Sequence, residues 1–165
     1  MKKLFLVTLS AILVLSTFFA GSVSTAAAKE LKILEFDTMV GNPPAFIGAT
    51  NPIRGINGGG ASWTVGSASG ELKASGKLEI KVQGLVLATT GSNPSATFRG
   101  LVSCLKSDGS FQNILTDPFP ATTGLASAGG GNATIEANLT LPHPCIAPII
   151  FVTSGGGSWF AATGS

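Results

Sequence analysis

The chain has 165 residues, of which 44% are hydrophobic and 11% charged, with 22 Gly, two Cys, one His and no Tyr. This composition excludes a disordered polyelectrolyte, a class that combines low hydrophobicity with high net charge. A formal charge of +2 gives no basic footprint for nucleic acid. One His and two Cys are too few for a structural zinc site built from these residues alone, which needs four ligands.

The N-terminus has the three parts of a secretory signal peptide. Two lysines form a positive n-region, residues 4–20 are almost wholly apolar, and Ala26 and Ala28 match the small-x-small pattern that signal peptidase accepts. We therefore predict that residues 1–28 are a signal peptide and residues 29–165 the exported domain. The alternative is a retained membrane anchor, because the apolar run has about the length of a short spanning helix. The compact Lys-Lys start is typical of bacteria.

Removal of the predicted signal peptide changes the charge balance. Taking 28 residues from 165 leaves 137, and the two lysines of the n-region leave with the signal, so eight basic residues face eight acidic ones. The exported domain is therefore formally neutral. It contains no second apolar segment long enough to span a membrane as a helix. We expect a secreted protein, extracellular or periplasmic, with no membrane span after cleavage.

Both cysteines, Cys104 and Cys145, lie in the exported part. An even number of cysteines outside the cytoplasm indicates one disulfide. Such a bridge would close a loop of 42 residues and stabilise the fold by about 4 kcal/mol in the chain-entropy model. Cys104 lies in an apolar strand pattern, which suits a buried bridge better than a reactive thiol. Two free thiols are the alternative.

Alternation of apolar and polar residues predicts strands throughout the exported part, and helical periodicity is nearly absent. The tetrapeptide Ser107–Ser110 predicts a hairpin turn, and Gly129–Gly131 predicts a flexible connector. Asp117–Pro120 is expected to end a strand, because proline cannot donate to a ladder. The expected strands cover residues 31–36, 62–67, 72–74, 77–82, 95–106, 111–116, 132–141, 147–153 and 159–162.

About eight or nine short strands with regularly spaced turns indicate an all-β, single-domain β-sandwich of immunoglobulin-like architecture with one disulfide. The order Cys…Trp…Cys of true immunoglobulin domains is lacking, since Trp63 precedes both cysteines and Trp159 follows both. The likeness is therefore one of architecture alone.

The two tryptophans are the candidate ligand-binding residues. Trp63 and Trp159 each follow a Gly-rich turn, and an exposed Trp beside such a loop can stack on a sugar or anchor a protein partner. Burial in the core of the sandwich is the alternative for both.

Signals for catalysis are weak. His143, the single histidine, stands between two prolines with no nucleophile motif beside it. Glu35 and Asp37 share one strand face by their spacing of two, and they would be the carboxylate pair of a hydrolase. The carboxylates lack the spacing of a calcium loop. We therefore expect no catalytic residue, no cofactor and no metal site.

Three segments resemble stretches of uncharacterised small secreted bacterial proteins that are rich in β-structure. They are residues 50–55, 116–122 and 144–153. The resemblance extends over most of the exported part. It implies export and a single β-rich domain, and it implies no activity.

These patterns together predict a secreted, non-enzymatic β-sandwich that acts as an extracellular interaction or structural module. Its partner would be an extracellular or cell-surface protein or a glycan, and not a nucleic acid. Two alternatives stay open: a small carbohydrate-binding domain that uses an exposed Trp, and a hydrolase with a carboxylate pair.

Overall fold

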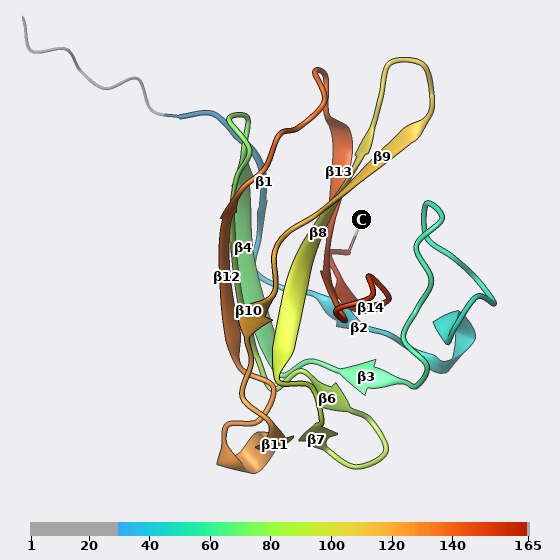
Figure 1. The fold of residues 1–165 in the computed structure, drawn as a ribbon, viewed down its shortest axis with the longest axis vertical. Helices are drawn as coiled ribbons and strands as arrows, with labels where there is room; N and C mark the ends of the chain where they lie inside the picture. Colours follow the sequence, from blue (N-terminus) through green and yellow to red (C-terminus); the bar gives the residue numbers. More distant parts are fainter. Residues whose placement is uncertain (1–29, 165) are drawn as a thin grey trace, which may run out of the picture.

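The computed structural model describes residues 30–164, which form antiparallel β-sheets, turns and two short 3-10 helices, η1 (Pro44–Phe46) and η2 (Ala126–Ala128) (Figure 1). The predicted signal peptide lies outside the described residues. Within these residues, no helix has the length and hydrophobicity of a membrane span. Sheets of four and six strands pack face to face around a shared core, which confirms the predicted all-β sandwich.

The four-stranded sheet has the order β1-β4-β5-β12, and all its neighbouring strands are antiparallel. On β5, Leu78, Ile80 and Val82 are buried, whereas Lys77 and Lys81 between them are exposed. One face of this sheet therefore meets the core and the other meets water, as the alternation predicts. The four strands are β1 (Lys32–Phe36), β4 (Ser67–Lys73), β5 (Lys77–Gln83) and β12 (Ala133–Asn138).

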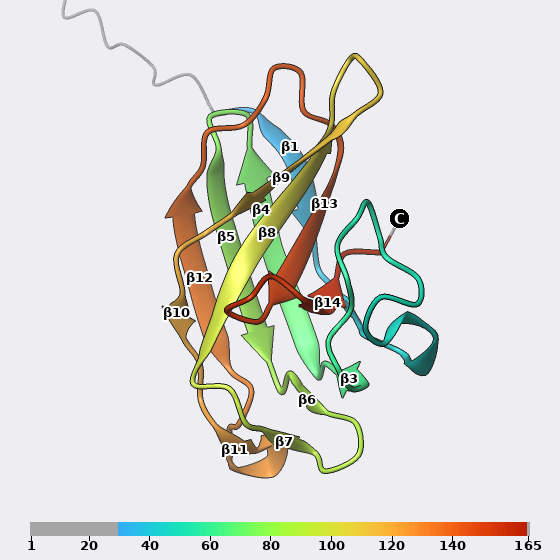
Figure 2. The same cartoon turned by 45° about the vertical axis from the view of Figure 1, so that its right-hand side comes forward.

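The six-stranded sheet has the order β10-β8-β13-β14-β2, and β9 pairs with β8 further along the same edge as β10. Its strands are β2 (Val40–Gly41), β8 (Thr97–Leu105), β9 (Phe111–Leu115), β10 (Phe119–Pro120), β13 (Ile146–Thr153) and β14 (Trp159–Ala162). Two ribbons of two-residue strands lie at one end of the sandwich (Figure 2). They pair β3 (Trp63–Thr64) with β6 (Val86–Leu87), and β7 (Ser92–Asn93) with β11 (Gly124–Leu125).

The main core lies between the two large sheets. Phe98, Val102 and Ile150 of the six-stranded sheet belong to the same buried cluster as Leu72 and Ile80 of the four-stranded sheet. A disulfide joins the fully buried Cys104 of β8 to Cys145, the residue just before β13, and so confirms the predicted bridge.

The segment Asp117–Pro120 does more than end a strand. Phe119 and Pro120 form β10, which pairs with the start of β8. A proline is accepted there because β10 is an edge strand, where the missing N–H costs no ladder bond. The prediction that this segment ends the preceding strand is confirmed, since β9 ends at Leu115, but the short strand β10 was not predicted.

The prediction that Gly129–Gly131 is a flexible connector is wrong. Gly130 and Gly131 are buried, and their N–H groups donate to the carbonyl oxygens of Leu125 at 2.9 Å and Thr122 at 2.7 Å. These glycines are used for close backbone packing, because a Cβ at either position would collide with neighbouring backbone atoms.

Residues 42–62, between β2 and β3, form an excursion over the outer face of the six-stranded sheet (Figures 1 and 2). Ile53 and Ile56 of the excursion belong to a second hydrophobic cluster with Leu101 and Phe151 of that sheet. The chain therefore covers this outer face itself. The outer face of the four-stranded sheet carries the exposed side chains of β5 and β12, and no segment of residues 30–164 covers it in this way. We call it the open face.

Candidate functional site

Four glutamates form a row across the open face. The strand register places them directly opposite one another on neighbouring strands, in the order Glu35, Glu71, Glu79 and Glu136. We call this set the glutamate row. Like charges in directly opposite positions destabilise a sheet, so the row requires cations beside it.

Two lysines supply much of this compensation. Lys32 Nζ lies 2.8 Å from a carboxylate oxygen of Glu35 and 2.7 Å from one of Glu71, and Lys81 Nζ lies 2.8 Å from Glu79. The hydrogen bond from Lys32 holds the pKa of Glu71 below its usual range. Glu71 is therefore ionised at neutral pH, where it accepts hydrogen bonds and cannot serve as a general acid.

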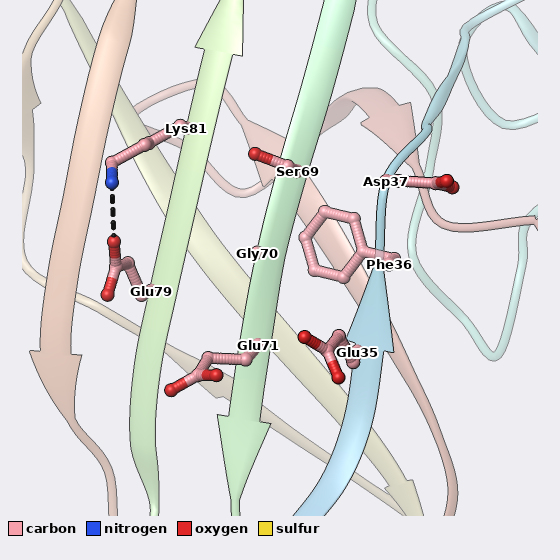
Figure 3. Close-up of a pocket in the computed structure, with 8 residues that line it drawn as sticks. All are labelled: Glu35, Phe36, Asp37, Ser69, Gly70, Glu71, Glu79 and Lys81. Atoms are coloured by element: carbon pink, nitrogen blue, oxygen red, sulfur yellow. Dashed lines mark ion pairs between the residues drawn. The ribbon is translucent and has the colours of Figure 1, made fainter.

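A hollow of about 680 Å³ opens among these side chains (Figure 3). Its floor lies around Gly70, where the absence of a side chain makes room for the ring of Phe36. A Cβ at Gly70 would lie 2.6 Å from Cζ of that ring and would also collide with the carbonyl oxygen of Glu79. Figure 3 shows the ring between β1 and β4, with Glu35 and Glu71 beside it. The hollow thus combines an aromatic ring with carboxylate oxygens.

The predicted carboxylate pair, Glu35 and Asp37, does line this hollow. Figure 3 shows the two carboxylates on opposite sides of the chain, with that of Asp37 directed away from Glu35. The nearest carboxylate on the next strand is instead that of Glu71, and Glu79 lies one strand further. The sequence pattern places both glutamates on outward strand faces, but it does not show that they lie opposite Glu35. Carboxylates side by side on one sheet lack the opposed arrangement that glycoside hydrolysis needs.

The two tryptophans lie away from this hollow and are buried. Trp63 is 5% exposed and stacks on Phe160 with ring centroids 3.9 Å apart, while Trp159 is 2% exposed and packs edge-on against Phe46. Each indole fills space in a hydrophobic cluster, so neither presents a free ring face to a ligand. Among the residues that line the hollow the aromatic side chain is Phe36, which is half-buried and also packs against the main core.

The single histidine is also remote from the lining of the hollow. His143 is exposed in the loop between β12 and β13 and is not among the residues that line it. Across residues 30–164, no three His, Cys, Asp or Glu side chains are grouped so as to hold a metal ion.

Comparisons with protein-family models, with curated proteins and with solved structures find no match to this chain. The resemblance to small secreted bacterial proteins therefore stays a prediction. The features that bear on function are the hollow and the glutamate row of the open face.

Proposed function

We propose that this protein is a secreted, non-enzymatic interaction module that binds a cell-surface or extracellular partner through its open face. The difference between the two sheets carries the proposal. The excursion covers the outer face of the six-stranded sheet, whereas the open face is exposed and contains the hollow. The backbone of the paired strands that carry this face is ordered before binding, which lowers the entropy cost of association.

The chemistry of the open face favours recognition of a polar partner. The glutamate row offers several acceptors, and Lys32 and Lys81 offer ammonium donors at fixed positions between them. The predicted signal peptide and the disulfide both suit a protein that acts outside the cytoplasm.

A binding screen with surface proteins and glycans tests the proposal on the exported protein. The double variant Glu79→Ala/Lys81→Ala removes an ion pair from the centre of the open face. The matched control Lys106→Ala/Asp108→Ala removes an ion pair of the same type at the β8–β9 turn. We expect affinity to fall about tenfold or more in the first variant only. Loss of binding in the control alone, or the absence of any ligand in the screen, would overturn the proposal.

A neutral oligosaccharide is a second candidate ligand, because Phe36 lines the hollow next to carboxylates. An aromatic face packs against the C–H groups of a sugar ring while carboxylates accept its hydroxyl protons. Phe36→Leu keeps an apolar side chain and removes the flat ring. Phe111→Leu, at a half-exposed aromatic on the other sheet, is the matched control. We expect oligosaccharide affinity to fall about tenfold in Phe36→Leu only, and equal affinity in both variants would exclude this ligand class.

A further inference from the structure

The edge of the six-stranded sheet at β9 is unpaired in the part of the chain that the structure describes. There β9 pairs only with β8. Thr116 N donates to Gly100 O at one end of this pairing, and Lys106 N donates to Ser110 O at the other. Even-numbered residues of β9 therefore direct their backbone groups toward β8, and odd-numbered residues direct theirs to the free side. Those residues are Phe111, Asn113 and Leu115, and nothing in residues 30–164 bonds to their outward N–H and C=O groups.

β9 also lacks the features that usually protect an exposed edge. Its sequence Phe-Gln-Asn-Ile-Leu has neither a charge nor a proline. The other long edge strands are different: β1 has a bulge and charged residues, and β12 carries Glu136. β2 and β10 have only two residues each. Because natural proteins blunt free edges with charge, proline, bulges or short length, an edge without them indicates that another strand covers it.

We propose that a second copy of this chain provides that strand. The two β9 strands would pair antiparallel about a two-fold axis at Asn113 and join the two six-stranded sheets into one. In this register Phe111 lies opposite Leu115 of the partner subunit, and the symmetry repeats the pair at the other end. Aromatic–aliphatic pairs in opposite positions stabilise a sheet, and Phe111 is 50% exposed in the single chain.

Charge complementarity favours a second copy over an unrelated peptide. The guanidinium of Arg54 lies 5.0 Å from the centre of the Phe111 ring. Pairing of β9 brings Asp117 of the partner subunit to the same end of the strand, two residues beyond its Leu115. Within the described chain neither Arg54 nor Asp117 forms an ion pair. Figures 1 and 2 show the β8–β9 hairpin standing out at one end of the sandwich, where a partner can approach.

The oligomeric state of the exported protein tests this inference independently of any ligand of the open face. We expect a concentration-dependent dimer in sedimentation equilibrium. Asn113→Pro removes the outward N–H at the two-fold axis and leaves the bonds to β8 intact. Asn113→Ala loses the same side-chain bond to the carbonyl of Arg54 but keeps the N–H. The dimer dissociation constant should rise about tenfold or more in the proline variant and less than about threefold in the alanine variant.

A cysteine at the axis gives a second readout that does not depend on the folding of the proline variant. Directly opposite residues of a hydrogen-bonded antiparallel pair lie about 5.5 Å apart at Cα, within reach of a disulfide. Asn113→Cys should therefore form a covalent dimer on oxidation, whereas Ser110→Cys, away from the axis, should not. A monomer at every concentration without this cross-link, or a dimer that Asn113→Pro leaves unchanged, would overturn the inference.

Discussion

Arg54 donates from Nη1 to the carbonyl oxygen of Ser103 at 2.9 Å, at the point where the ladder between β8 and β13 is interrupted. The register shifts between Ile146 and Ile149, and Ala147 within this interval has a φ of +42°. Arg54 Nη2 donates to the carbonyl oxygen of Ala147, also at 2.9 Å. The guanidinium therefore bridges both strands at the irregularity and fastens the excursion to the sheet.

We expect Arg54→Ala to lower the free energy of unfolding by about 2 kcal/mol, because two carbonyls lose a charged donor. Arg54→Lys should lose almost as much, since an ammonium cannot reproduce the planar fork that reaches both strands. Urea denaturation measures both changes. The control is Lys77→Ala on the open face, with an expected change below about 0.5 kcal/mol. Full stability in Arg54→Lys would contradict the role of the fork.

The disulfide should contribute about 4 kcal/mol to stability, given the 41-residue separation of its two cysteines. The variant Cys104→Ala/Cys145→Ala removes the bridge without placing a hydroxyl in the buried site of Cys104. Its midpoint of denaturation should fall accordingly, and reduction of the unmodified protein should lower stability by a similar amount. Two alkylatable thiols in the native protein would contradict the bridge itself.

Local sequence patterns predicted the elements whose signals lie close together in the chain. The expected strand 159–162 coincides with β14, and the expected turn at Ser107–Ser110 separates β8 from β9. The two-residue strands β2, β6, β7, β10 and β11 were missed, because two residues carry no period. Their pairing depends on the tertiary contacts of the chain and not on alternation.

The candidate site could be predicted only in part, for the same reason. Period-two spacing placed Glu35 on an outward face, but its neighbours Glu71 and Glu79 follow from the register of β1, β4 and β5, which sequence spacing does not specify. The Gly-rich turns before Trp63 and Trp159 suggested exposure. Each turn instead leads into a strand on which the Trp is buried. A Gly-rich turn therefore does not predict whether the indole after it points to solvent or to the core.

The pKa of Asp108 gives a test of the β8–β9 turn. One carboxylate oxygen of Asp108 accepts hydrogen bonds from Ser110 Oγ at 2.6 Å and Ser110 N at 2.9 Å, which lowers the pKa of this carboxyl to about 2. Because the pKa is lower in the folded state, its stabilising contribution is complete above the usual value of about 4 and is lost as the pH falls toward 2.

An NMR titration of Asp108 should therefore have its midpoint near pH 2. Ser110→Ala removes the hydroxyl bond and keeps the backbone N–H. The midpoint should move up toward the usual value of about 4 without reaching it. A midpoint near 4 in the unmodified protein would show that the two bonds to Ser110 do not form in solution.

A comparison of alanine substitutions at two glycines distinguishes the cost of steric crowding from the cost of a positive φ. Gly131 and Gly91 have φ of +79° and +62°. A Cβ at Gly131 would collide with the backbone of Leu85, whereas a Cβ at Gly91 would meet nothing within 4 Å. Alanine at either position carries about 1–2 kcal/mol of left-handed strain.

Gly131→Ala must in addition displace the backbone around Leu85, whose N–H donates to the carbonyl oxygen of Gly131 at 3.0 Å. Its loss of stability should therefore exceed that of Gly91→Ala by about 2 kcal/mol or more. Thermal and urea denaturation of the two variants measure the difference. Equal losses of unfolding free energy in the two variants would mean that the chain around Gly131 moves aside at no cost. That outcome would fit a flexible connector and would contradict a buried, hydrogen-bonded segment.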